Sequence, residues 1–192
     1  MKKLLLAALV STSFLGACAT SMDSPMVVKS SMSAPMVGGA AMYPNKDIID
    51  NAVNSKDHTT LVAAVKAAGL VDTLKGPGPF TVFAPTNASF AALPAGTVDT
   101  LLKPENKSML SNILTYHVVS GRVDSAALAQ MIRAGNGRAM IKTVNGGTLI
   151  ATMSGSNVLI TDAKGGSATV TIADVYQSNG VIHVVNKVLL PG

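Results

Sequence analysis

The sequence has little of the chemistry that most enzymes and nucleic-acid-binding proteins use. Its 192 residues include one cysteine, three histidines and no tryptophan, and aromatic residues make up 4%. A single cysteine excludes a disulfide within the chain. The 15 Lys and Arg outnumber the 10 Asp and Glu by only five and form no long basic run. Nucleic-acid binding normally needs a clustered basic face, usually with stacking aromatics, so we expect no nucleic-acid partner.

Catalytic sequence patterns are also missing. There is no G-x-S-x-G elbow and no H-E-x-x-H pair. His58, His117 and His183 are too far apart in the sequence for two of them to share a helix face. The turns GPGP (76–79) and KGGS (164–167) lack the helix and lysine of a phosphate loop. We therefore predict neither an enzyme nor a bound cofactor or metal.

The N-terminus has the layout of a secretory signal peptide. MKK supplies positive charge, and the apolar stretch 4–17 is too short for a stable membrane anchor. It ends in LGAC (15–18), which resembles the lipobox of bacterial lipoproteins. We predict a signal peptide over 1–17, cleaved before Cys18, and a lipid on Cys18. The alternative is an ordinary signal peptide followed by a chance cysteine.

Lipidation would hold the protein in the cell envelope. Ala19 after the cysteine favours the outer membrane, by analogy with lipoprotein sorting. Removing the two leader lysines lowers the net charge from +5 to +3. The prediction is an exported protein whose membrane partner is reached through the lipid.

Residues 18–42 are rich in Ser, Pro, Gly and Met and show no helical or strand period. We predict a flexible linker that ends where a domain begins at Tyr43. The alternative is a Cu(I) carrier, since soft thioethers suit that ion. Its ligands would be Met22, Met26, Met32, Met36 and Met42.

The remainder, 43–192, is long enough for one domain with one core. Apolar spacing predicts helices over 45–54, 57–70, 96–103, 104–119 and 124–135, with Asp57 as an N-cap and Gly69 after a C-terminus. A strand over 80–83 precedes a short helix that Thr86 or Asn87 can cap. Turn-punctuated strands then follow over 139–144, 147–153, 157–162, 168–177 and 181–190, with Asp162 and Asp174 at strand ends. Helices first and hairpins later predict an α+β fold with a largely antiparallel sheet.

The three histidines have different surroundings in the sequence. His58 falls in the first turn of a helix, where we expect it to be exposed. His117 in LTYHVV and His183 in VIHVV have apolar neighbours on both sides. We predict that these two are buried and neutral, with a hydrogen-bond partner, because an unpaired buried imidazole is costly. Thr86 and Asn87 are candidate partners for His117.

Three blocks together are similar to the fasciclin domain family. They are FTVFAPTNASFAAL (80–93), MLSNILTYHVVSGRV (109–123) and ADVYQSNGVIHVVNKVLLP (173–191). The resemblance covers about 43–191, within the single domain predicted over 43–192, and implies a wedge-shaped β-sandwich of mostly antiparallel strands with flanking N-terminal helices. It makes Thr86, Asn87 and His183 part of the family's structural motif, and implies no shared catalytic site. It also makes Tyr116 and His117 candidates for contact with a partner.

Together these observations predict a lipid-anchored interaction module at the cell surface or in the envelope. The function that the resemblance implies is adhesion, or binding of a cell-surface or matrix protein or glycan. The alternative function is an envelope ligand or Cu(I) carrier that uses the methionines of the linker.

Overall fold

The computed structural model describes residues 34–192, in which helices come early and strands late. The helices are α1 (Ile48–Ala52), α2 (Thr59–Ala68), α3 (Val71–Lys75), α4 (Asn87–Ala91), α5 (Thr97–Leu101), α6 (Lys107–Tyr116) and α7 (Ser125–Ala134), with 3-10 turns at Lys56–His58 and Pro104–Asn106. The strands are β1 (Met36–Val37), β2 (Ala40–Ala41), β3 (Phe80–Pro85), β4 (Val118–Ser120), β5 (Arg138–Lys142), β6 (Thr148–Ser154), β7 (Asn157–Thr161), β8 (Ser167–Gln177) and β9 (Gly180–Val185). No helix among these residues is long and apolar enough to cross a membrane.

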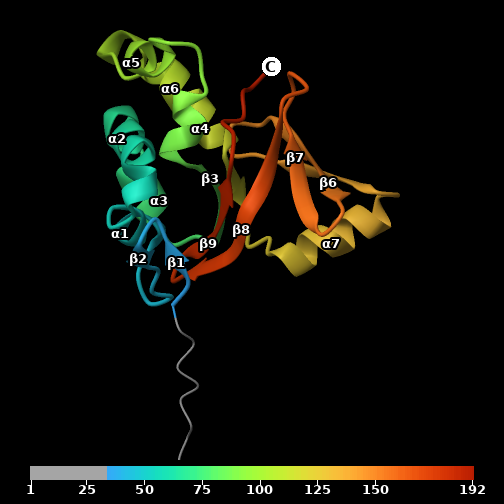
Figure 1. Cartoon of the computed structure of the whole chain (residues 1–192). Helices are drawn as coiled ribbons and strands as arrows, with labels where there is room; N and C mark the ends of the chain where they lie inside the picture. Colours follow the sequence, from blue (N-terminus) through green and yellow to red (C-terminus); the bar gives the residue numbers. More distant parts are fainter. Residues whose placement is uncertain (1–33) are drawn as a thin grey trace, which may run out of the picture. The chain divides into compact units, whose positions relative to one another are not determined.

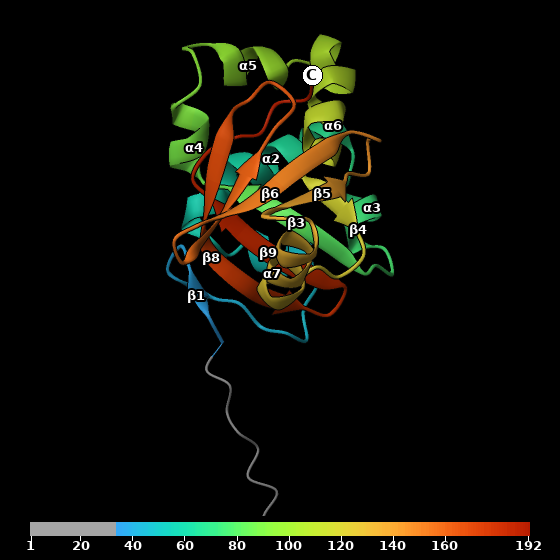
Figure 2. The same ribbon diagram turned by 90° about the vertical axis from the view of Figure 1, so that its right-hand side faces the viewer.

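Seven strands form one curled sheet in the order β4-β3-β9-β8-β7-β6-β5. All neighbours pair antiparallel except β3 and β9, which run parallel. The two ends of the sheet approach each other through a bridge between Val119 and Thr143, so the strip nearly closes into a barrel. The predicted α+β class with mostly antiparallel strands is confirmed. Both layers of the predicted sandwich are parts of this one seven-stranded sheet (Figures 1 and 2).

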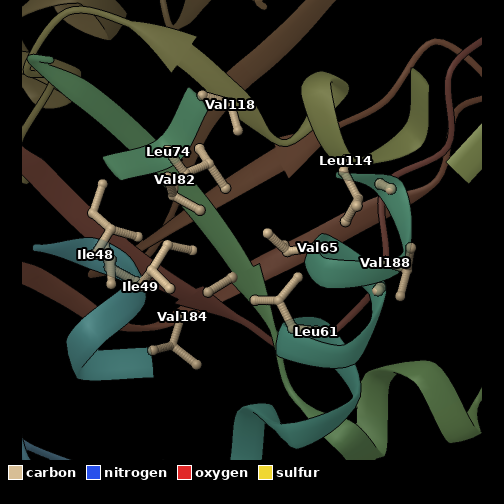
Figure 3. Packing of buried hydrophobic residues seen from close by; sticks show 14 of the residues in the cluster. Ile48, Ile49, Leu61, Val65, Leu74, Val82, Leu114, Val118, Val184 and Val188 are labelled. Atoms are coloured by element: carbon tan, nitrogen blue, oxygen red, sulfur yellow. The ribbon is translucent and has the colours of Figure 1, made fainter. Parts of the chain in front are cut away.

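Two apolar cores lie on this sheet. In the first, aliphatic side chains of α1, α2, α3 and α6 pack against β3 and β9, as Figure 3 shows for Leu61, Leu114 and Val82. In the second, Leu128 and Ile132 of α7 pack against the inward residues of β5 and β6, such as Ile141 and Leu149. The helices α1–α3 and the helix α7 therefore cover different parts of the sheet (Figure 1).

Local signals placed several helix ends correctly. Gly69 follows α2 with a φ of 73°, the left-handed conformation that a residue without Cβ adopts easily. Thr86 caps α4 in a reciprocal capping box with Ser89. The predicted N-cap Asp57 is wrong, because α2 begins at Thr59. The predicted helix over 104–119 is too long, since α6 ends at Tyr116 and Val118 already lies in β4.

The predicted start of the domain at Tyr43 is also wrong. Residues 36–41 form the β1–β2 hairpin, turned by Gly38 and Gly39, both with positive φ. The Met42 amide donates to the Pro35 carbonyl at 2.9 Å, and the Lys56 amide donates to Gly38 at 3.2 Å. Val37 and Met42 reach the core of the helical half. The fold therefore includes residues that composition alone assigned to a linker.

We expect Met42→Ala to lower the free energy of unfolding by about 2–3 kcal/mol, because a core methionine leaves a cavity when truncated. The side chain of Met42 is 2% exposed, whereas that of Met36 on the same hairpin is 60% exposed. Met36→Ala is the matched control and should change stability by less than about 0.5 kcal/mol. Equal urea midpoints for the two variants would show that the hairpin does not pack on the core.

Candidate functional site

His117 joins the end of α6 to the C-terminal segment. Its Nδ1 lies 2.8 Å from the Ile113 carbonyl, and its Nε2 accepts the Leu189 amide at 2.9 Å. Because an amide N–H can only donate, Nε2 is the acceptor and Nδ1 carries the proton. Both ring nitrogens are thus used by the backbone, in the neutral form that the sequence predicts.

Tyr116 lies beside His117 and makes a similar pair of bonds. Its hydroxyl donates to the Thr148 carbonyl at 2.9 Å and accepts the Ala163 amide at 3.0 Å. These bonds tie α6 to β6 and to the turn after β7. Gly147 lies against the tyrosine ring so closely that a Cβ there would be 2.7 Å from it. A side chain at this glycine would displace the ring.

Asp162 completes the cluster. Its carboxylate accepts the amides of Lys164 at 3.0 Å, Gly166 at 2.7 Å and Leu190 at 3.0 Å. His117 and Asp162 therefore hold two consecutive amides, those of Leu189 and Leu190. We name Tyr116, His117 and Asp162, with this Leu189–Leu190 segment, the C-terminal clamp.

Burial shifts the pKa values of two clamp residues, His117 and Tyr116. It lowers the pKa of His117 from 6.5 to about 4, and the Ile113 carbonyl and Asp162 oppose this effect. Burial likewise raises the pKa of the Tyr116 hydroxyl above its usual value of 10. Neither of these two side chains changes charge near pH 7.

The side chains of Tyr116 and His117 are 1% and 3% exposed. They lie inside the fold and present almost no surface to a second molecule. In this conformation a partner approaching LTYHVV meets neighbouring residues such as Ser120, which is exposed. Their contact with a partner therefore remains a prediction that would require a change of conformation.

Ser125, Asp174 and His183 lie close together, but they do not form a catalytic relay. The Asp174 carboxylate accepts both the amide and the hydroxyl of Ser125. His183 uses Nε2 on the Val123 carbonyl at 2.8 Å, and its Nδ1 accepts the Asp174 amide at 3.4 Å. A relay requires the histidine to bond the serine. Here the serine bonds the aspartate directly, and the histidine joins two backbone segments.

The expectation that His58 is exposed is wrong. It is 3% exposed, and it lines a cavity together with Val37 of the hairpin, Met42 just after it, and residues of α1. Its Nδ1 lies 2.8 Å from the Ser55 hydroxyl, whereas its Nε2 has no hydrogen-bond partner in the described protein. The imidazole borders a cavity of about 30 Å³ whose other lining residues are apolar. Burial lowers the pKa of His58 below 6.5.

Thr86 and Asn87 do not touch His117, so they are not its partners. Asn87 instead binds the start of α2: its amide nitrogen donates to the Lys56 carbonyl at 2.8 Å, and its oxygen accepts the Thr60 amide at 3.0 Å. Ser89, the capping partner of Thr86, donates to Val185 of β9 at 3.1 Å. The two predicted motif residues position the helical half against the sheet.

Two of the five proposed methionine ligands lie in the described part of the chain. Met42 lies in the core and Met36 on the surface, while Met22, Met26, Met32 and Cys18 fall outside the described residues. Burial removes Met42 from a flexible set of five ligands. Within residues 34–192, no three His, Cys, Asp or Glu side chains are placed to hold a metal ion.

Sequence reasoning did not find the partners of His117. The only available signal was the turn TDAKGG, which placed Asp162 at a strand end where its side chain binds turn amides. Nothing local linked that aspartate or His117 to the apolar residues Leu189 and Leu190. These hydrogen bonds are donated by backbone amides, which almost every residue carries. The residue types at 189 and 190 therefore give no sign of the contact.

Comparisons with known proteins find relatives over much of the chain. The chain is 46% identical over 156 residues to the protein sll1483 of Synechocystis, covering 81% of this chain and 79% of that one. It is 43% identical over 97 residues to the cell surface glycolipoprotein MPB83 of Mycobacterium bovis, covering 48% of this chain and 41% of that one.

Among solved structures, the fold is similar to a FAS1 domain pair from the insect cell adhesion molecule fasciclin I. The TM-score is 0.53 at 25% identity, covering 68% of this chain and 43% of that one. The fasciclin domain family matches residues 56–191, which include α2, the whole seven-stranded sheet and the C-terminal clamp. The chain therefore belongs to the fasciclin domain family.

Proposed function

We propose that the chain is a lipid-anchored interaction module of the cell envelope, which serves adhesion or the binding of a surface or matrix component. The observation that carries the proposal is the family match over residues 56–191. The adhesion molecule that shares the fold and the glycolipoprotein that shares part of the sequence support the same role. The lipid is proposed from the LGAC stretch at 15–18.

The arrangement of polar side chains supports binding over chemistry. The side chains of His117 and His183 bond backbone groups on both ring nitrogens. The Asp162 carboxylate accepts backbone amides, and the Asp174 carboxylate accepts the amide and the hydroxyl of Ser125. Polar side chains whose hydrogen bonds are all made within the domain stabilise a rigid scaffold. A rigid scaffold suits a module that acts through its surface, because less ordering entropy is lost on association.

The anchor is tested by Cys18→Ala in the full chain. We expect the variant to lose its place in the membrane fraction, or to accumulate with its signal peptide attached, because no thiol remains for the lipid. Fractionation of cells followed by mass determination of the chain measures both. Ser21→Ala, three residues away, is the control and should fractionate as the wild type does. A Cys18→Ala chain that is processed and still sediments with membranes would rule out the anchor.

A further inference from the structure

The outward face of strands β5–β7 continuing onto β8 is a surface that the helices leave uncovered. Strand alternation places Ala139, Ile141, Leu149, Ala151 and Ile160 inward, where α7 and the second core bury them. Every outward position of β5, β6 and β7 is exposed or half-buried. In Figure 1 these strands stand at the end of the sheet away from α1–α3.

The strand register fixes which residues share this face. Met140 pairs with Ile150, Ile150 with Thr161, and Thr152 with Leu159, which in turn pairs with Thr169. We name this surface the threonine face. Its members are Arg138, Met140, Lys142, Thr148, Ile150, Thr152, Asn157, Leu159, Thr161, Ser167, Thr169 and Thr171.

The threonine face carries cations and hydroxyls but no carboxylate. Between Ser125 and Gly192 the sequence has two acidic residues, Asp162 and Asp174, against five Lys and Arg. Asp162 is buried in the C-terminal clamp, and Asp174 bonds Ser125. Arg138 and Lys142 are exposed on β5, and Lys164 is exposed in the turn that ends β7. None of these three cations forms a salt bridge in the described structure.

The spacing of the cations favours a long ligand. Arg138 and Lys142 lie four residues apart on one strand, which is roughly 13 Å at the usual strand rise. One small anion cannot contact both. A polymer with regularly repeated negative groups can contact both. Met140 lies between the two cations on β5, and Ile150 and Leu159 lie on the adjacent strands β6 and β7; these apolar side chains and the neighbouring hydroxyls suit the C–H groups and hydroxyls of sugar rings.

A nucleic acid is the other common polyanion, but the face lacks what nucleic acids use. None of the twelve residues is aromatic, so bases would have no stacking partner. We infer that the threonine face binds an acidic polysaccharide along β5–β8. This inference rests on the proposed function, because it names the partner of an envelope interaction module.

The test measures retention of the purified full chain on immobilised polygalacturonate, a polymer with one carboxylate per sugar, with dextran as the uncharged control. We expect binding to polygalacturonate in low salt, loss of binding at high ionic strength, and none to dextran. The double variant Arg138→Glu/Lys142→Glu should weaken the affinity about tenfold or more, since opposed charges replace attractive ones.

The matched control is Lys66→Glu/Lys103→Glu, which changes the net charge equally at two exposed positions on the helical half. It should alter the affinity less than about threefold, because screened charges far from the site contribute little. Equal losses in the two double variants would overturn the inference, as would the absence of binding to polygalacturonate. Tighter binding to a single-stranded DNA oligonucleotide, lost in the β5 variant, would also overturn it in favour of a nucleic acid.

These outcomes are separate from those of the anchor test. A chain that is released from membranes by Cys18→Ala but shows no polysaccharide binding leaves the proposed function standing and overturns only this inference. A chain that binds polygalacturonate through β5 but stays in membranes without Cys18 supports this inference and overturns the anchor.

Discussion

Replacing His117 with alanine is expected to lower the free energy of unfolding by about 3–5 kcal/mol. The substitution leaves the Ile113 carbonyl and the Leu189 amide without partners in a buried site, at about 1–3 kcal/mol for each unsatisfied group. The empty ring volume adds a cavity cost. Urea unfolding at pH 7.5, followed by far-UV circular dichroism, measures the difference.

Two further variants give losses in the free energy of unfolding with which the His117→Ala loss can be compared. Ser120→Ala changes an exposed residue of β4 and should cost less than about 0.5 kcal/mol. Tyr116→Phe removes the hydroxyl that bonds Thr148 and Ala163, and should cost about 1–3 kcal/mol. A His117→Ala chain as stable as Ser120→Ala, but defective in binding its partner, would show that His117 acts directly on the partner.

Mild acid is expected to destabilise the domain strongly. Burial lowers the pKa of His117 to about 4 in the folded chain, below its value of 6.5 when unfolded. As pH falls below 6.5 the unfolded chain therefore takes up a proton that the folded chain does not. The stability from neutral His117 is complete above pH 6.5 and declines towards pH 4. His117 alone should make the domain about 2 kcal/mol less stable at pH 5.0 than at pH 7.5.

The other two histidines act in the same direction. Burial also lowers the pKa values of His58 and His183. All three histidines of the chain are therefore harder to protonate in the folded state than in the unfolded state. Comparing urea midpoints at pH 5.0 and 7.5 for wild type and His117→Gln isolates the contribution of His117. The difference between the two pH values should shrink by about 2 kcal/mol in the variant. An unchanged difference would mean that His117 is not held neutral by the fold.

Features set by neighbouring residues were predicted well from the sequence. Gly69 ends a helix because the left-handed conformation suits it, and Thr86 caps one because its hydroxyl reaches an amide three residues on. The hairpins of the second half follow from alternating apolar residues and turn residues. The α+β class followed from these local elements and their order.

Features set by distant contacts were not predictable in this way. Composition indicated a linker through Met42, but Met42 is buried because the hairpin folds over α1 and the 56–58 turn. The same packing buries His58, whose helical position alone suggested exposure. His117 was expected to be buried and bonded, yet its partner Leu189 lies 72 residues away and bonds through its backbone. Sequence patterns identify the polar residue, but only the tertiary structure identifies the backbone group that it meets.

The position of the last strand has a consequence for the order of folding. β9 ends at Val185, yet it lies inside the sheet between β3 and β8, and the clamp holds residues 189 and 190 beyond it. A chain growing on the ribosome lacks this central strand until residues 180–185 have been made, so β3 and β8 have nothing to join them until then. The nascent domain therefore stays incompletely folded while β9 is missing. The seven-stranded sheet is complete only when β9 has entered between β3 and β8.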